Sequence, residues 1–318
     1  MSDVFKVIDL VTGYQPAAAL VAAGRLGVYD CLADGPLSPA AVSDAISTDA
    51  GATRALLDAL VGVELLTTDG SRYALTSAAR RLASDGDLRL VAEKEAYFAR
   101  VWLSLEDSVR TGVPQLAPWA TRLATDPEQA RSFLEALVVL AETTGPDLTS
   151  VIPTGSRVAD LGGGLGAYAA PLAAAGHTVT LVDLPPVAAW AASVLPASVS
   201  VSPVDLLSPH AASTVGTASY DVALLSHLLH DLTDDDCATV LRVAHEILAP
   251  GGRVVVFELP GDPPGAFGPL FDLMMHVETP GRARRLAELV ALVEQAGFSN
   301  VHVSAKHPLP HGVVVGTG

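Results

Sequence analysis

The chain has 318 residues, of which 19 are basic and 35 are acidic, so its formal net charge is −16. Clustered Lys and Arg supply most of the affinity of proteins for nucleic acids and for anionic membranes, so this charge predicts binding to neither. Half of the residues are hydrophobic and 17% are charged, which favours a large folded core and excludes a disordered chain.

The cysteine count and the N-terminus indicate a cytoplasmic protein. Cys31 and Cys237 are too few for a disulfide framework or a cysteine-based metal site. The first residues lack the basic-then-apolar pattern of a signal peptide. No stretch approaches the roughly 20 apolar residues that are needed to span a bilayer.

Residues 1–88 have the pattern of a small, mainly helical domain. A helical apolar period covers residues 8–32, and Ser38 is a suitable N-cap for a helix that ends near residue 46. A second helix is expected over 50–63, and strands over 65–67 and 73–75 flank a turn. Two helices followed by a hairpin predict a winged-helix-like domain. Because Arg54 is the only cation of the second helix, we expect a domain for dimerisation and substrate closure and not a DNA reader.

The pattern changes twice after this domain. Residues 89–150 predict several helices, which would link the domains and line a substrate pocket. From residue 151 the pattern alternates between strands and helices, which predicts a parallel, doubly wound, Rossmann-like α/β domain over 151–318. The strands are expected at 158–161, 179–183, 201–206, 220–225 and 253–258, and a terminal antiparallel pair at 301–303 and 313–315. Thr233 and Asp236 form a start signal for a helix that ends near residue 248.

A nucleotide site is expected at the carboxyl ends of the first strands. Gly162, Gly164 and Gly166 follow the first strand directly, and glycines let the backbone approach a ligand closely. Asp183 ends the second strand, where a carboxylate accepts both hydroxyls of a ribose. Leu184 and Ser226, which come next to the ends of the second and fourth strands, complete the predicted cofactor site.

Two cofactors fit this loop. A loose dinucleotide fingerprint is present, because Gly162 and Gly164 are followed by Ala167. Asp160 stands just before the glycines, however, where a carboxylate repels a pyrophosphate and attracts a cationic amino acid. Asp205 and Leu206 at the end of the third strand suit an adenine amino group. These details favour S-adenosylmethionine (SAM) over a nicotinamide dinucleotide.

Several blocks resemble the plant-type O-methyltransferase family, a class I SAM-dependent group that is widespread in bacterial natural-product pathways, including antibiotic biosynthesis. The blocks are VADLGGGLG at 158–166, LVDLP at 181–185, LLHD at 228–231 and APGG at 249–252. The resemblance implies a homodimer with interlocked N-terminal domains and a small-molecule substrate. It also implies that His230 is the general base that deprotonates a phenol, and that Glu258 orients this base.

Three positions depart from the family pattern. Leu232 replaces a Trp, the second acid of the pocket is missing from residues 281–285, and His276 replaces an apolar residue. A branch of the superfamily that methylates the β-carbon of α-keto acids uses a metal held by a similar His-Asp pair and a second His. The resemblance to that branch implies a metal site formed by His230, Asp231 and His276, whose ligand types suit iron or zinc. The reaction also needs a second base, and His227, one helical turn before His230, is a candidate for it.

The missing second acid and the presence of His276 favour metal-assisted C-methylation of the β-carbon of an α-keto acid. The chemistry agrees with these residue types, because a divalent cation stabilises the enolate of a keto acid. O-methylation of a phenolic hydroxyl is the alternative, with a hydrogen-bonded core role for His276 and a turn-capping role for Asp231. Three further alternatives are a SAM-binding enzyme that transfers no methyl group, such as a hydroxylase or a pericyclase-like enzyme, a nicotinamide-dependent dehydrogenase, and a winged-helix regulator.

Overall fold

A computed structural model describes residues 3–145, 148, 151–262, 265–304 and 311–318. They form two compact units, residues 1–100 and 101–318. The domain boundary that the sequence predicted at residue 150 lies outside the described residues.

The first unit contains the predicted helices and hairpin. Its elements are α1 (Asp3–Thr12), α2 (Tyr14–Leu26), α3 (Val28–Cys31), α4 (Pro39–Ile46), α5 (Ala50–Gly62), β1 (Leu66–Thr68), β2 (Tyr73–Leu75), α6 (Ser77–Arg80) and α7 (Leu88–Val101). The Ser38 side chain accepts a hydrogen bond from the N–H of Ala41 at 3.2 Å, as expected for the N-cap of α4. β1 and β2 pair in antiparallel fashion, which confirms the winged-helix-like arrangement of helices and hairpin.

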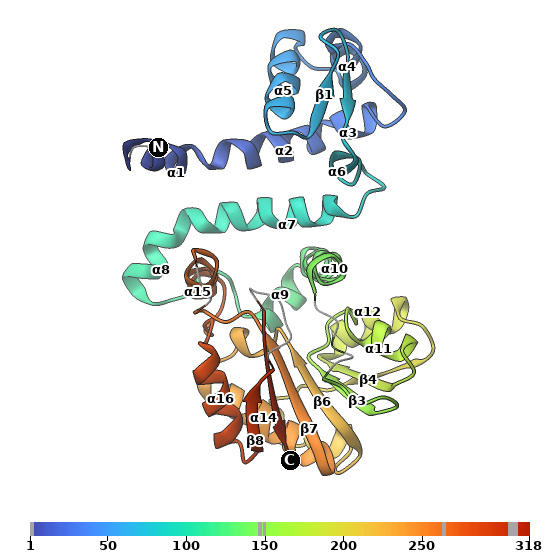
Figure 1. The fold of residues 1–318 in the computed structure, drawn as a ribbon, viewed down its shortest axis with the longest axis vertical. Helices are drawn as coiled ribbons and strands as arrows, with labels where there is room; N and C mark the ends of the chain where they lie inside the picture. Colours follow the sequence, from blue (N-terminus) through green and yellow to red (C-terminus); the bar gives the residue numbers. More distant parts are fainter. Residues whose placement is uncertain (1–2, 146–147, 149–150, 263–264, 305–310) are drawn as a thin grey trace. The chain divides into compact units, whose positions relative to one another are not determined.

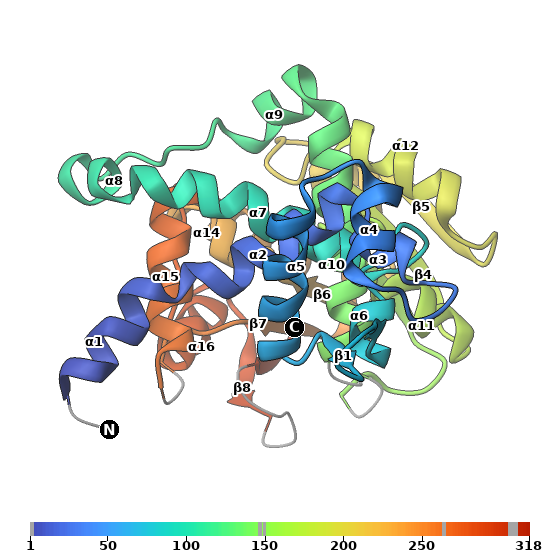
Figure 2. The ribbon, with the colours of Figure 1, turned by 90° about the horizontal axis from the view of Figure 1, so that it is seen from above.

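The N-terminal helices correct one expectation from the sequence. α1 and α2 follow one another along one line (Figure 2), and residues 3–26 are long and apolar enough to cross a membrane by length and composition. The sequence predicted no stretch long and apolar enough to span a bilayer. Pro16 does not end the helical stretch, because it lies in the first turn of α2, where its missing N–H is tolerated. Only 6% of the most apolar window is buried within the chain, so the helix pair exposes an apolar surface.

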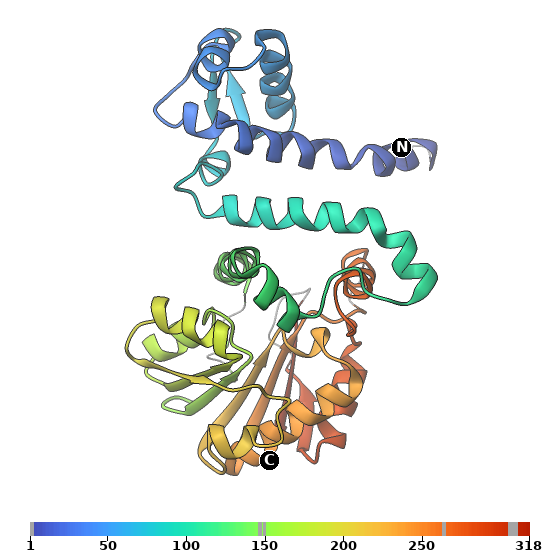
Figure 3. The same cartoon turned by 180° about the vertical axis from the view of Figure 1, so that it is seen from behind.

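The second unit is a three-layer α/β domain (Figures 1 and 3). Its helices before the sheet are η1 (Trp102–Ser104), α8 (Leu105–Thr111), α9 (Trp119–Thr125) and α10 (Pro127–Thr144). The strands are β3 (Arg157–Leu161), β4 (Thr178–Asp183), β5 (Val199–Pro203), β6 (Tyr220–Ser226), β7 (Leu248–Glu258), β8 (Ser299–Val303) and β9 (Gly312–Thr317). The other helices are α11 (Ala169–Ala174), α12 (Pro185–Val194), α13 (Ala211–Val215), η3 (Leu229–Asp231), α14 (Asp234–Ile247), α15 (Phe267–Glu278) and α16 (Leu286–Gln295).

Within the described residues, the strand order is β5-β4-β3-β6-β7-β9-β8. The first five strands are parallel, and β9 pairs with both β7 and β8 in antiparallel fashion. This confirms the doubly wound sheet and the terminal antiparallel pair. The third strand ends at Pro203 and not at Leu206, because the backbone leaves the sheet after Val204 donates a hydrogen bond to the carbonyl of Asp183.

Two apolar clusters cover the two faces of the sheet. Residues of α13, α14 and α16 pack on one face, and residues of α11 and α12 on the other. Along β3, Val158 belongs to one cluster and Ala159 and Leu161 to the other, as the two-residue period of a strand requires. The carboxyl ends of β3, β4, β6 and β7 therefore meet at one edge of a sheet that is buried on both faces.

Candidate functional site

The loop after β3 approaches the neighbouring strands closely. Gly162, Gly164 and Gly166 have φ angles of 71°, 58° and 85°, in the left-handed region that favours glycine. A Cβ atom at Gly163 would lie 2.7 Å from Oδ2 of Asp160. The loop therefore leaves no room for side chains over the end of β3, as expected where a ligand packs directly on the backbone.

Asp183 fixes this loop from the end of β4. Its Oδ2 accepts a hydrogen bond from the N–H of Gly164 at 2.8 Å, and its Oδ1 accepts one from the N–H of Leu184 at 2.7 Å. Burial raises the pKa of Asp183 to about 6, although these two hydrogen bonds oppose the rise. Each carboxylate oxygen keeps a second lone pair, which leaves Asp183 able to accept ribose hydroxyls.

Asp160 is buried at the end of β3, and neither of its carboxylate oxygens has a hydrogen-bond partner in the described part of the chain. Burial, and then the charge of Asp183, raise the pKa of Asp160 to about 7. A buried carboxylate without a partner is costly. A cationic amino group of a ligand would relieve that cost, so the residues at this edge fit SAM.

The other predicted cofactor residues lie at the same edge but differ in exposure. Ser226 is the last residue of β6 and is buried. Asp205 is exposed after the end of β5, and its Oδ1 accepts a hydrogen bond from the N–H of Leu207 at 2.9 Å. Leu206 is buried in the core beneath the sheet, so its side chain packs inside the protein, and contact with an adenine through its backbone stays a prediction.

His230 and Glu258 form the best-defined pair of the site. His230 lies in η3, directly after β6, and Glu258 is the last residue of β7. The Nδ1–H of His230 donates to Oε2 of Glu258 at 2.7 Å. Oε1 of Glu258 accepts hydrogen bonds from the N–H groups of Leu229 and His230, and Oε2 accepts another from Leu259. Glu258 therefore holds the whole η3 segment as well as the imidazole ring.

The charges around His230 determine its protonation. Burial opposes the imidazolium form, but the carboxylates of Glu258, Asp231 and Glu278 outweigh burial and raise the pKa of His230 to about 9. For Glu258, burial opposes ionisation, but the charge of His230 outweighs it and lowers the pKa. Each charge thus favours the other, and Nε2 of His230 is the nitrogen left for a substrate.

His227 is next to this pair but is not suited to act as a base. Burial lowers its pKa to about 3, so it accepts a proton poorly at neutral pH. Its backbone has a φ of 51°, a strained value for a residue with a Cβ. Its ring packs at 4.6 Å from that of Phe257. These contacts favour a neutral packing role for His227, and its role as second base stays a prediction.

The predicted metal ligands do not gather into one site. Nε2 of His230 lies 3.8 Å from Oδ1 of Asp231, but His276 is exposed on α15. Among the residues that the structure describes, the one group with suitable ligand atoms within 4.8 Å of one another is His227, His230 and Glu258. The oxygens of Glu258 already accept four hydrogen bonds, which occupy its lone pairs. These residues do not fit a resident metal ion.

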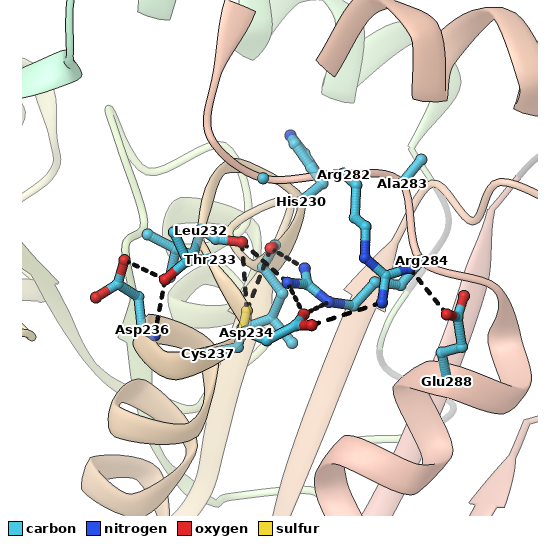
Figure 4. A network of polar contacts seen from close by, with 12 residues as sticks. His230, Leu232, Thr233, Asp234, Asp236, Cys237, Arg282, Ala283, Arg284 and Glu288 are labelled. Carbon is cyan, nitrogen blue, oxygen red and sulfur yellow. Dashed lines mark hydrogen bonds and ion pairs between the residues drawn. The ribbon is translucent and has the colours of Figure 1, made fainter. Parts of the chain in front are cut away.

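Arg284 is a functional candidate that the sequence analysis missed. Its guanidinium is buried and donates to the carbonyl oxygens of Leu229 at 2.6 Å and Leu232 at 2.9 Å, and to Oδ1 of Asp234 (Figure 4). A Cβ at Gly281 would overlap the backbone of His230. Arg284 thus holds the η3 segment through its carbonyl oxygens, and Glu258 holds it through its N–H groups. A run of three arginines and one alanine gives no sign of which arginine is buried, so the sequence held no usable signal.

A second missed residue is Glu278. The sequence analysis found the expected second acid missing from residues 281–285, and Ala283 is indeed packed in an apolar cluster. Glu278 is buried at the end of α15 and is one of the carboxylates that raise the pKa of His230. Phe271, seven residues earlier on α15, contacts the His230 ring at 5.1 Å. A carboxylate therefore still raises the pKa of His230, but it comes from Glu278 on α15 and not from residues 281–285.

Comparisons with known proteins agree with this site. The sequence model of an O-methyltransferase dimerisation domain matches residues 8–85, and that of an O-methyltransferase domain matches residues 102–299. Acetylserotonin O-methyltransferase from Mus musculus is 31% identical over 99% of this chain and 89% of the relative. An N,N-dimethyltransferase, OxyT, from Streptomyces rimosus is 28% identical over 92% of this chain and 90% of the relative.

The fold is also shared with solved structures. Human N-acetylserotonin methyltransferase, solved in complex with SAM, superposes with a TM-score of 0.87 at 24% identity, over 100% of this chain and 98% of that chain. Two family models together cover most of the chain, and one relative is more than 30% identical to it. These matches establish the family. The chain belongs to the O-methyltransferase family of SAM-dependent methyltransferases and carries that family's dimerisation domain at its N-terminus.

Proposed function

We propose that the protein transfers the methyl group of SAM to a phenolic hydroxyl of a small molecule, with His230 as the general base. The observation that carries the proposal is the 2.7 Å hydrogen bond between Nδ1 of His230 and Glu258. It fixes the ring with Nε2 directed away from Glu258, as a base held by a carboxylate requires.

The residues present account for the steps that this reaction needs from the protein. Once His230 has lost its proton, Nε2 accepts the proton of the phenol, and Glu258 stabilises the imidazolium that forms. The phenolate oxygen is then the nucleophile. SAM supplies an electrophilic methyl group on a sulfonium. Asp160 and Asp183 bind and orient that donor at the ends of β3 and β4, so that catalysis beyond proton transfer is mainly positioning.

The expected C-methylation of an α-keto acid is not supported. That reaction needs a Lewis acid near the keto group, and the three residues predicted to hold one are not brought together, because His276 is exposed on α15. O-methylation agrees better with the relatives, several of which are named as O-methyltransferases, such as the acetylserotonin enzyme. It also agrees with the His230–Glu258 pair, which provides one base. A phenol needs only one base, because its conjugate base is already nucleophilic.

This chain resembles several Streptomyces enzymes, among them a mitomycin biosynthesis 6-O-methyltransferase from Streptomyces lavendulae. This resemblance supports a role in natural-product biosynthesis.

The apolar surface of α1 and α2 supports a homodimer built through the first unit. Cys31 and Cys237 are both free thiols, which is compatible with the reducing cytoplasm.

The test is a methyl-transfer assay with isotope-labelled SAM on three acceptor sets: phenols, aryl amines and α-keto acids, each with and without a chelator. We expect label on a phenolic oxygen, no effect of chelator, and a loss of about 10²- to 10⁴-fold in kcat for His230→Gln. Label on a keto-acid carbon, or on nitrogen only, would overturn the choice of acceptor.

The donor site is tested separately. Asp183→Ala should abolish the binding of S-adenosylhomocysteine, measured by calorimetry, while Asp205→Ala should have a smaller effect because Asp205 is exposed. Unchanged affinity in Asp183→Ala would refute the assigned donor site. A protein that binds S-adenosylhomocysteine but labels no acceptor would point to a SAM-binding enzyme of another reaction class.

A further inference from the structure

His227 is a polar side chain of the site that the proposed reaction does not use. It is partly buried and follows β6 directly. Its ring lies 4.6 Å from the ring of Phe257, 6.3 Å from that of Tyr168 and 5.8 Å from that of His311. Neither of its ring nitrogens has a hydrogen-bond partner among the described residues. Polar groups inside proteins are nearly always paired, so these nitrogens are available to a ligand.

The backbone at His227 holds this ring in place at a cost. Its N–H donates to the carbonyl of Phe257 at 2.8 Å, which extends the pairing of β6 with β7 by one residue. The chain then turns with a φ of 51°. A glycine adopts this left-handed conformation freely, whereas a residue with a Cβ is strained there. Strain of this kind concentrates at ligand sites, so a His at this turn indicates a use for its side chain.

The ring of His227 is close to the proposed base. A ring nitrogen of His227, a ring nitrogen of His230 and a carboxylate oxygen of Glu258 lie within 4.8 Å of one another. The two ring centroids are 6.1 Å apart. Because an N–H···O hydrogen bond spans about 2.7–3.2 Å, two imidazoles at this spacing can each contact one of two neighbouring oxygens of the same small molecule. A phenol that reaches His230 thus brings its adjacent ring substituent close to His227.

His227 offers this substituent a neutral polar contact. Burial lowers its pKa to about 3, so the imidazole is uncharged at neutral pH. A neutral imidazole has one N–H donor and one acceptor nitrogen, which suits the oxygen of a hydroxyl, a methoxyl or a carbonyl group. The other ring beside His230 is that of Phe271, at 5.1 Å. That ring is apolar, so only one of these two neighbours of the base can recognise an oxygen.

We infer that the acceptor carries a second, uncharged oxygen ortho to the hydroxyl that is methylated, and that His227 recognises this oxygen through a hydrogen bond. His227 is then a specificity-determining residue, while His230 accepts the proton. The inference rests on the proposed function and narrows its acceptor class from phenols to ortho-oxygenated phenols.

The test compares two isomeric acceptors, 2-methoxyphenol and 4-methoxyphenol, which differ only in the position of the second oxygen. The wild type should methylate 2-methoxyphenol with a kcat/KM about 10-fold higher, as one hydrogen bond allows. His227→Phe keeps an aromatic ring against Phe257 and removes the nitrogens. It should raise the KM for 2-methoxyphenol about 10-fold and leave the KM for 4-methoxyphenol unchanged. Because the recognised oxygen does not react, kcat should stay within about twofold of the wild type.

Two further variants separate recognition from folding. His227→Asn keeps a hydrogen-bonding side chain and tolerates a positive φ, so its KM for 2-methoxyphenol should stay below that of His227→Phe. Equal KM values in the two variants would assign the loss to shape and overturn the inference. His245→Phe is the matched control and should change neither acceptor. His245 is also partly buried and packs against a phenylalanine, Phe298, at 5.0 Å, but it lies near the end of α14, just before β7 begins.

The outcomes separate this inference from the proposed function. Equal kcat/KM of the wild type for the two isomers, or an unchanged KM in His227→Phe, overturns the role of His227 alone. A loss of kcat for both isomers with a shifted pH profile would make His227 a base. A lower melting temperature with an equal rise in both KM values would make it a packing residue, and either result overturns the inference. If the wild type labels no phenol at all, the proposed function itself is wrong.

Discussion

Oε2 of Glu258 lies 2.7 Å from Nδ1 of His230, and Oε1 of the same carboxylate accepts hydrogen bonds from the backbone of Leu229 and His230. One carboxylate therefore orients a ring and also anchors the short helix that carries it. Because both functions depend on a single residue at the end of β7, changes at Glu258 should affect the pKa of His230 and its position together.

Glu258→Gln should shift the pH dependence of methyl transfer. In the wild type, His230 has a raised pKa of about 9, so the fraction of free base, and with it the rate, should increase as the pH rises towards 9. Removing the carboxylate charge of Glu258 leaves only Asp231 and Glu278 to oppose burial, so the pKa of His230 falls. The ascending limb of kcat should therefore move to lower pH while the maximal rate falls. Its position is measured with an acceptor whose own pKa lies outside the scanned range, and an unmoved limb would contradict the assignment of His230 as the base.

His276→Leu should leave methyl transfer within about twofold of the wild type, because His276 is exposed on α15 and outside the His227–His230–Glu258 group. Addition of a strong chelator should not change the rate of either protein. The same substitution at the proposed base, His230→Leu, should abolish activity. A large loss in His276→Leu, together with inhibition by chelator, would restore the metal hypothesis.

Arg284→Met should lower both stability and activity. The substitution removes the guanidinium donor from the carbonyl oxygens of Leu229 and Leu232 and leaves them with weaker donors, such as the thiol of Cys237. The loss of a hydrogen bond to a charged group costs about 1.5–3 kcal/mol. For a domain of this size, each kcal/mol lowers the melting temperature by about 2–4 °C.

Asp234→Asn is the control for the clamp on η3. The carboxylate of Asp234 is largely exposed, so its loss should change the melting temperature little, and kcat should stay near the wild-type value. If Arg284→Met loses stability but keeps the wild-type kcat and pH profile, Arg284 supports the fold only and does not position His230.

Leu10→Glu should dissociate the homodimer. Leu10 is 81% exposed within one chain and lies on α1 among other exposed apolar residues, including Phe5 and Val11. A carboxylate introduced there would have to be buried against the second copy, and burial of an unpaired charge is costly. Size-exclusion chromatography with light scattering should show a monomer for Leu10→Glu and a dimer for Asp9→Asn. A wild-type protein that is monomeric at micromolar concentration would refute the dimer.

The sequence predicted those features that local chemistry determines. The glycine loop, Asp183 at a strand end, and the caps at Ser38 and Thr233 each depend on a few adjacent residues, and the structure places them as expected. The pairing of His230 with Glu258 followed from the family resemblance, since 28 residues separate the two.

Features set by tertiary packing were beyond prediction. Nothing in the sequence around His276 indicates that it faces solvent while Phe271 and Met275 on the same helix face inwards. The burial of Arg284 depends on backbone carbonyls more than 50 residues away. The ring of Tyr168 packs against Phe257, which is distant in the sequence.

The place of β9 has a consequence for synthesis of the chain. Gly312 pairs with Glu258, and β9 lies between β7 and β8 in the sheet. The edge of the strand that ends in Glu258 is therefore covered by a segment that is synthesised much later than β7. A polypeptide released before residue 312 would expose the edge of β7, and an open strand edge invites pairing with other chains. Chains that stop before residue 312 should thus be aggregation-prone as well as inactive.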